Sequence, residues 1–252
     1  MSAGRRQAGA LLAGLLLTGA LAAQPAVPPS LLARLAETLP EIAAEDVRPS
    51  GVPGLYEVRR GTAIGYVTAD GEYLIAGDLV ALRSGESLTE RRRMQLRVEA
   101  LRPLLAEAIV FAPPQPRYWL TILTDTECQY CRALHSEMPR INALGIAVQY
   151  LFYPRKGPLS SDFRQAQDVY CASDRRQALT RAKQGRKLDS PVCEDPVLAQ
   201  FTAAQALGIR GTPAMVLPDG ALHYGYMTPE ALLGLFEPVA AEGLPGALPA
   251  GP

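Results

Sequence analysis

The feature that most constrains this chain is a pair of cysteines, Cys128 and Cys131, placed between a strand and a helix. Residues 118–123 are dense in apolar and β-branched side chains, which predicts a buried strand. Apolar residues then recur at helical spacing over 128–143, and 146–152 is a second continuous strand. The sequence therefore predicts a β-α-β unit with both cysteines at the strand-to-helix junction.

This junction gives the two cysteines different chemistry. The first turn of a helix presents unpaired N–H groups and about half a positive charge, which stabilise a thiolate and lower its pKa. Cys128 stands at the end of the helix and is expected to be the more exposed, whereas Cys131 lies inside the first turn. We expect Cys128 to attack a substrate disulfide and Cys131 to resolve the mixed disulfide that forms.

Two other roles for a Cys-x-x-Cys pair are half of a zinc site and a structural bridge. Zinc requires two further ligands, and the chain offers only His135, His223 and the distant Cys171 and Cys193. We therefore expect neither a metal nor a cofactor. His135 is expected on the surface of its helix, outside the catalytic set, and Glu127 is expected to face water.

Thr212 and Pro213 precede a predicted strand at 214–217. A proline cannot donate a hydrogen bond to a sheet, so its place here needs a reason. A cis Thr212–Pro213 bond supplies one, and it would let the Thr212 backbone pair with an extended substrate beside Cys128. The alternative is a trans proline in an ordinary loop.

The N-terminus predicts export. Arg5 and Arg6 precede an uncharged apolar run over 8–23 that closes with small residues, which is typical of a signal peptide at 1–23. The alternative is a membrane anchor, for which the run is about as short as a span can be. Export brings the cysteines into an oxidising compartment.

In such a compartment Cys171 and Cys193, 22 positions apart, are expected to form a structural disulfide. A bridge closing a loop of this length contributes roughly 3 kcal/mol. The alternative is a second redox pair, although neither cysteine stands in a Cys-x-x-Cys motif.

The pattern along the chain predicts two folded units. The pattern over residues 24–83 predicts a small unit made of a helix and an antiparallel sheet. The helix is expected at 30–39, with Ser30 as its N-terminal cap, and a hairpin is expected at 69–71. Residues 84–110 predict a linker helix that Pro103 kinks or ends.

The second unit, at 111–240, combines the β-α-β motif, a helical insert over 155–207 and a β-β-α ending. This order is the plan of a thioredoxin-like α/β domain. The Gly-, Pro- and Ala-rich tail at 241–252 predicts disorder.

The first unit is too small to bury its own apolar strands, which suggests a homodimer. The side chains expected to need cover are Tyr66, Val67, Tyr73, Leu74 and Ile75.

The net charge of the chain argues against nucleic acid as a partner. The 25 basic and 25 acidic residues give a formal net charge of zero, whereas a nucleic-acid-binding protein needs a basic surface. The run Arg91–Arg93 fits a solvated helix face.

The residues around the four cysteines and Pro213, taken together with their neighbours, resemble the DsbC/DsbG family of bacterial periplasmic disulfide isomerases. The resemblance is carried by Thr124–Cys131, Leu134-His135, Asn142–Ile146, Tyr150-Leu151, Pro154–Gly157, Cys171-Ala172, Cys193, Leu207–Ile209, Gly211–Ala214, Asp219-Gly220 and Gly225-Tyr226, and more loosely by Tyr66–Gly71.

The resemblance implies a cystatin-like α+β dimerisation domain, a linker helix and two catalytic domains that face one cleft in a homodimer. It implies Cys128 as nucleophile, Cys131 as resolving thiol, Thr212 and cis-Pro213 in the substrate groove, and a structural Cys171–Cys193 disulfide. It also implies a periplasmic location, misfolded disulfide-containing exported proteins as substrates, and reduction by the membrane reductase DsbD.

Two residues depart from the family pattern. Gln129 is neither the Gly of the DsbC branch nor the Pro of the DsbG branch, and Pro139 should kink the active-site helix about two turns in. Two other functions share these residues: a DsbA-like disulfide oxidase, and a dimeric holdase chaperone with secondary redox activity.

Overall fold

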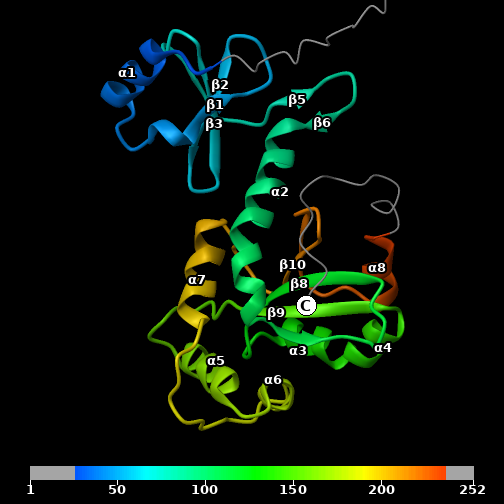
Figure 1. Cartoon of the computed structure of the whole chain (residues 1–252). Helices are drawn as coiled ribbons and strands as arrows, with labels where there is room; N and C mark the ends of the chain where they lie inside the picture. Colours follow the sequence, from blue (N-terminus) through cyan, green and yellow to red (C-terminus); the bar gives the residue numbers. More distant parts are fainter. Residues whose placement is uncertain (1–25, 237–252) are drawn as a thin grey trace, which may run out of the picture.

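The computed structural model describes residues 26–236. The predicted signal peptide at 1–23 and the predicted tail at 241–252 lie outside these residues. A smaller N-terminal unit is joined by one long helix, α2, to a larger C-terminal unit (Figure 1).

The N-terminal unit is a four-stranded antiparallel sheet with a helix beside it. Its elements are α1 (Pro29–Thr38), a 3₁₀ turn (Ala44–Asp46), β1 (Val47–Pro49), β2 (Leu55–Arg60), β3 (Ala63–Thr68) and β4 (Leu74–Ile75), with β4 at one edge. The predicted hairpin at 69–71 joins β3 to β4. The predicted Ser30 cap is wrong: Pro28 occupies the N-cap position, and Pro29 with its fixed φ begins the helix instead.

Both faces of this sheet are covered more completely than the short length of the N-terminal unit suggested. Leu31 and Leu35 of α1 pack with Val58 and Val67 in one buried cluster. Tyr66, on the other face, is 2% exposed, packs against Leu96 of α2 and bonds through its hydroxyl to Thr89 at 2.5 Å. The expectation that Tyr66 and Val67 need a second copy for cover is therefore wrong, because α1 and α2 cover them within the chain.

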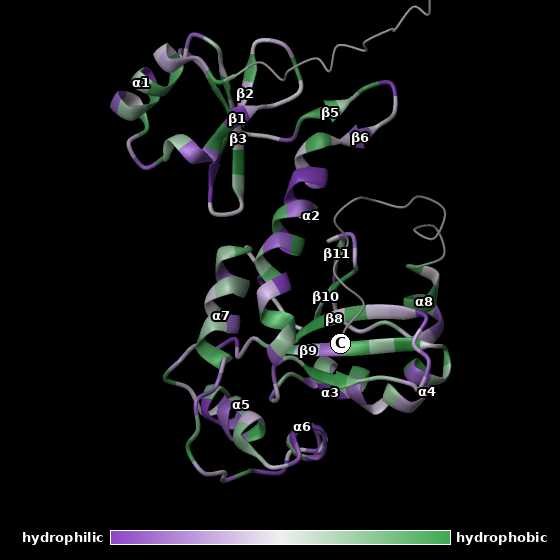
Figure 2. Ribbon diagram, viewed as in Figure 1, coloured by the Kyte–Doolittle hydropathy of each residue, from purple (hydrophilic) through white to green (hydrophobic). Residues whose placement is uncertain are grey.

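The connection to the second unit is a short hairpin followed by a helix. Strands β5 (Val80–Ala81) and β6 (Glu86–Ser87) pair, and α2 (Leu88–Leu101) begins where the Ser87 hydroxyl accepts a hydrogen bond from the Glu90 N–H. The helix ends before Pro103, as predicted, and continues as a 3₁₀ segment (Arg102–Glu107). Figure 2 shows α2 mostly in hydrophilic colours where it crosses between the units.

The end of α2 packs tightly on the C-terminal unit. Arg97 Nη1 donates to the carbonyl of Gly220 at 3.0 Å. Gly220 has φ +92°, and a Cβ there would lie 2.1 Å from the Met94 carbonyl oxygen. Only glycine permits this approach of the two backbones.

The C-terminal unit contains a five-stranded sheet in the order β11-β10-β8-β9-β7. Its strands are β7 (Ile109–Phe111), β8 (Tyr118–Thr124), β9 (Ile146–Phe152), β10 (Ala214–Val216) and β11 (Leu222–Tyr224). The central β8–β9 pair is parallel and the other pairs are antiparallel. Every residue of β9 is buried, which explains its apolar sequence, broken only by Gln149. The edge strand β7 was not predicted, because three residues are too few for a pattern to show.

Up to Phe236, where the described part of the chain ends, this unit also has six helices: α3 (Gln129–Ser136), α4 (Met138–Ala143), α5 (Ser161–Cys171), α6 (Arg175–Lys183), α7 (Val197–Ala206) and α8 (Pro229–Gly234). Pro139 produces more than the predicted kink, since the helix is interrupted at Glu137 and α4 starts anew with the proline in its first turn. Helices α5, α6 and α7 form the predicted insert, and Figure 1 shows α5 and α6 side by side.

Residues 26–236 contain no helix that is long and apolar enough to cross a membrane. Over the same range, no group of three or more His, Cys, Asp or Glu side chains could hold a metal ion.

Candidate active site

Cys128 occupies the N-cap of α3, directly after the turn that leaves β8. Its Sγ accepts a hydrogen bond from the Cys131 N–H at 3.4 Å. The buried Asp125 shapes the turn, because its carboxylate accepts from the Glu127 N–H at 2.8 Å. The strand-to-helix junction predicted from the sequence is therefore present, and both cysteines belong to the first turn.

The two thiols have opposite pKa shifts. Hydrogen bonding from the Cys131 thiol is the largest cause that lowers the pKa of Cys128, to about 5, with Thr212, the Cys131 N–H and the positive charge of Arg155 acting in the same direction. Burial, followed by its hydrogen bond with Cys128, raises the pKa of Cys131 far above its ordinary value. At neutral pH Cys128 is a thiolate and Cys131 a thiol.

Exposure separates the two cysteines less than predicted. Cys128 is 2% exposed and Cys131 is 1% exposed. The exposed fraction alone therefore does not distinguish the thiols: hydrogen bonding lowers the pKa of Cys128, whereas burial and then a hydrogen bond with Cys128 raise the pKa of Cys131.

The peptide bond between Thr212 and Pro213 is cis, so the trans alternative is wrong. It immediately precedes β10, whose Ala214 pairs with Leu123 of β8. This pairing brings Thr212 beside the cysteines, where the Cys128 Sγ lies 3.2 Å from the Thr212 carbonyl oxygen.

Arg155 and Lys156 lie near the cysteine turn. Arg155 Nε donates to the buried Asp125 carboxylate at 2.9 Å, and its charge lowers the pKa of Cys128. Lys156 pairs with Glu127 at 2.7 Å, and Glu127 is exposed, as expected. Arg155 was not identified from the sequence, because thirty residues separate it from Asp125.

The other two cysteines are joined to each other. A disulfide links Cys171, at the end of α5, to Cys193, which precedes α7, with the two Cα atoms 5.6 Å apart. The bridge ties the helical insert together across the intervening α6.

His135 is buried, so its expected surface position is wrong. Its ring nitrogens bond to the Tyr150 hydroxyl at 3.2 Å and to Thr180 Oγ1 at 3.1 Å. Burial, and then the nearby charge of Lys183, lower its pKa to about 4, so the ring is neutral at neutral pH.

Lys183 was missed by the sequence analysis. It is the last residue of α6, and it follows Leu179 by four positions on the apolar face of that helix. A lysine on the apolar face of a helix was the available signal.

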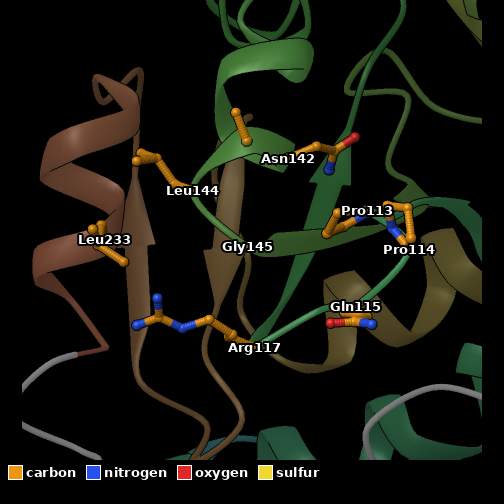
Figure 3. A pocket seen from close by; sticks show the side chains of 9 residues that line it. Pro113, Pro114, Gln115, Arg117, Asn142, Leu144, Gly145 and Leu233 are labelled. Atoms are coloured by element: carbon orange, nitrogen blue, oxygen red, sulfur yellow. The ribbon is translucent and has the colours of Figure 1, made fainter.

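A shallow pocket lies elsewhere on the unit, between the α4–β9 turn and α8 (Figure 3). Arg117, Asn142 and Leu233 are among the residues that line it. Neither the two cysteines of α3 nor Thr212 and Pro213 line it, so it is separate from the cysteine site.

Two family models match the chain. A model described as a thioredoxin-like domain matches residues 105–240. A model described as the N-terminal domain of disulfide bond isomerase protein matches residues 19–90.

Curated relatives match across both units. The chain is 33% identical over 192 residues to the thiol:disulfide interchange protein DsbC of Dickeya dadantii, a match that covers 76% of this chain and 80% of that protein. It is 32% identical over 191 residues to DsbC of Escherichia coli K12, with the same coverage of both chains. A solved disulfide interchange protein from Neisseria gonorrhoeae is 24% identical, with a TM-score of 0.47 over 52% of this chain and 96% of that one.

An N-terminal isomerase domain, a thioredoxin-like domain and relatives of this identity over most of their length establish the family. The chain belongs to the DsbC family of thiol:disulfide interchange proteins.

Proposed function

We propose that this chain is a thiol:disulfide interchange enzyme that isomerises or reduces incorrect disulfides in exported proteins. The observation that carries the proposal is the placement of the two cysteines in the first turn of α3, where the Cys128 sulfur accepts from the Cys131 N–H and the pKa values of the two thiols shift in opposite directions. A thiolate at Cys128 is ready to attack, and a protonated Cys131 beside it does not compete for the same disulfide.

In the first step the Cys128 thiolate attacks one sulfur of a substrate disulfide. A bond forms between Cys128 and that sulfur, the substrate S–S bond breaks, and the other substrate sulfur leaves as a thiolate. In isomerisation, a different substrate thiolate attacks the substrate sulfur of the mixed disulfide. A new substrate disulfide forms, the bond to Cys128 breaks, and Cys128 leaves as a thiolate. In reduction, Cys131 attacks Cys128, the Cys128–Cys131 disulfide forms, and the substrate leaves with two thiols.

The cis-proline loop supports a role in substrate binding. The Thr212 main chain lies against Cys128, and an extended segment paired with it would pass within reach of the sulfur. Thr212 and Pro213 are therefore proposed as the substrate-binding residues.

The exported location and the partners follow from the proposal. The N-terminal sequence supports export, and the family resemblance supports the periplasm and the membrane reductase DsbD as the source of electrons. The division into an N-terminal unit at 24–83, a linker at 84–110 and a catalytic unit at 111–240 belongs to the same proposal.

A homodimer is supported by the edge of the N-terminal sheet. Tyr73 is 70% exposed, and Leu74 and Ile75 of the edge strand β4 are also exposed. Apolar side chains on an unpaired edge strand favour pairing with another strand. A two-fold dimer would cover them and place two cysteine sites on one assembly.

The test is recovery of activity from a substrate protein oxidised with scrambled disulfides. We expect the mature chain to restore native pairing in catalytic amounts, and Cys128→Ser to abolish this. The DsbA-like alternative predicts fast oxidation of a reduced substrate and a pair that is oxidised when trapped from cells. The holdase alternative predicts suppression of aggregation that survives loss of both cysteines and no recovery of scrambled substrate.

A further inference from the structure

Behind the cysteine turn lies a lysine that the steps above do not use. Lys183, at the C-terminal end of α6, is 4% exposed. Its Nζ donates to the Asp125 carbonyl oxygen at 3.0 Å and to the Thr124 hydroxyl. Both acceptors belong to the segment that connects β8 to Cys128.

No carboxylate pairs with this ammonium group within residues 26–236. The Asp125 carboxylate accepts a hydrogen bond from Arg155, and Lys183 bonds only to the Asp125 backbone carbonyl. A buried cation without a counter-ion is costly, and an apolar side chain of similar size would be neutral or stabilising there. Fold stability therefore does not explain a lysine at this position.

Thr124 and Asp125 interact with both Lys183 and Cys131, although Lys183 uses the Asp125 carbonyl and the thiol can accept only from the Asp125 N–H. A hydrogen bond with the Thr124 side chain and one with the Asp125 backbone both lower the pKa of Cys131, and the charge of Lys183 acts in the same direction. The Thr124 hydroxyl thus interacts with both the lysine amine and the buried thiol. It can accept a proton from one group and donate its own to the other.

We propose that Lys183 is a positioning residue for the reductive step. Acting through the Thr124 hydroxyl, Lys183 accepts the proton that Cys131 loses. The proposal rests on the proposed roles of Cys128 and Cys131 and adds the route by which the buried thiol is deprotonated. It concerns the resolving step alone.

In this step the Cys131 S–H proton passes to the Thr124 oxygen while the Thr124 proton passes to neutral Lys183, which leaves a thiolate and an ammonium. The thiolate attacks the Cys128 sulfur of the mixed disulfide, the Cys128–Cys131 bond forms, and the bond to the substrate breaks. The substrate sulfur leaves with the electron pair and takes a proton from solvent, so the substrate is reduced and the cysteine pair is oxidised.

Lys183 can hold or release the proton near neutral pH. Burial is the main cause that lowers its pKa to about 8, so a fraction of the amine is neutral in that range. The charged and titratable groups that face it are Cys128, Cys131, Asp125, Arg132, His135 and Tyr150.

The other groups do not supply a base. His135 is neutral, but its two nitrogens are held by Tyr150 and Thr180. Asp125 is held by Arg155, and burial raises the pKa of Tyr150. Lys183 is the group in this cluster that combines a suitable pKa with a path to Cys131.

The experiment is a stopped-flow reaction of the reduced full-length mature protein with an aromatic disulfide whose thiolate absorbs visible light. The first phase reports attack by Cys128 and depends on reagent concentration. The second reports attack by Cys131 and does not. Both are measured against pH in wild type, Lys183→Met, Thr124→Val, Thr124→Ser and the surface control Lys187→Met.

We expect Lys183→Met to leave the first phase within about twofold and to slow the second at neutral pH by about tenfold or more, the scale of a lost proton acceptor. Its second phase should rise with pH without the inflection near pH 8 that we expect of wild type. Thr124→Val should behave alike, whereas Thr124→Ser and Lys187→Met should match wild type. If Lys183→Met does not fold, the comparison of Thr124→Val with Thr124→Ser still decides the test.

A second phase of wild-type rate and pH profile in Lys183→Met or Thr124→Val would overturn the inference. So would equal slowing by Thr124→Ser and Thr124→Val, or equal slowing of both phases in Lys183→Met. If the wild-type protein itself shows no first phase, the proposed function fails, which is a different result.

Discussion

The Cys128 sulfur lies 3.2 Å from the carbonyl oxygen of Thr212, although 84 positions separate the two residues in the sequence. The pairing of β10 with β8 and the cis bond before Pro213 produce this contact. A carbonyl at this distance favours a protonated thiol. The Cys131 thiol, the Thr212 side chain and the Cys131 N–H, which all lower the pKa of Cys128, outweigh it. In the proposed function, this contact places Cys128 beside the main chain with which a substrate strand would pair.

The first prediction concerns the acidity of Cys128. Because its pKa lies near 5, alkylation of the reduced protein should follow a titration with a midpoint near pH 5 and remain fast at pH 7. Ultraviolet absorbance of the thiolate should show the same midpoint and should be lost in Cys128→Ala. A midpoint near the ordinary value of a free thiol would contradict the site geometry.

The same shift makes stability depend on pH. A thiol whose pKa is lowered on folding stabilises the reduced folded state fully above its unfolded value, near 9, and this contribution is lost as pH falls through 5. The difference in unfolding free energy between the reduced protein and Cys128→Ala should therefore grow from pH 5 to pH 9. Denaturant titrations at several pH values measure it, and a difference that stays constant over this range would be inconsistent with the shift.

The disulfide between Cys171 and Cys193 should be structural. Replacing both residues by Ala should lower the free energy of unfolding by about 3 kcal/mol, because the denatured chain gains the freedom of the opened loop. The rate of attack by Cys128 should change little. Peptide mapping without reduction should recover the two residues linked, and recovery of either as a free thiol would refute the assignment.

The contact between α2 and the β10–β11 turn has a matched pair of glycines for a test. Gly220→Ala should destabilise the protein by more than about 1 kcal/mol, because it adds a backbone clash with Met94 to the cost of positive φ. Gly225→Ala, which also has positive φ but open space around it, should carry only the second cost. Equal thermal shifts for the two variants would show that the contact with α2 does not form in solution.

The proposed dimer can be tested at the exposed edge of the N-terminal sheet. Tyr73→Lys combined with Ile75→Lys places two charges on β4 and its turn, so it should convert a dimer to a monomer by light scattering. Leu159→Lys, on an exposed loop of the catalytic unit, is the control and should stay dimeric. A wild-type protein that is monomeric at micromolar concentration would rule out the dimer.

Much of this molecule could be predicted from the sequence, because its local signals agree with one another. The buried run of β8, the helical spacing after Cys128 and the turn residues of the hairpin at 69–71 correspond to elements in the structure. The cis bond at Thr212–Pro213 could be predicted because a proline cannot donate to the ladder of the strand that it leads into, and cis bonds are accessible before proline.

The features that were missed depend on contacts between distant segments. Tyr66 is buried by α2, and His135 is buried by β9 and α6, which no pattern within either element reveals. Arg155 and Lys183 come to the cysteine turn from beyond β9 and from the insert. Edge strand β7 is set by its pairing with β9 and is too short to show a period.

Every reaction step proposed for this protein requires that Cys128 attacks and Cys131 resolves, and capture of the mixed disulfide distinguishes the two roles. Cys131→Ser and Cys128→Ser should each be incubated with a scrambled disulfide substrate, quenched in acid, and separated without reduction. We expect covalent adducts in Cys131→Ser, with mass mapping placing the substrate on Cys128, and none in Cys128→Ser. Adducts that accumulate on Cys131 in Cys128→Ser, with none in Cys131→Ser, would show that the roles are reversed.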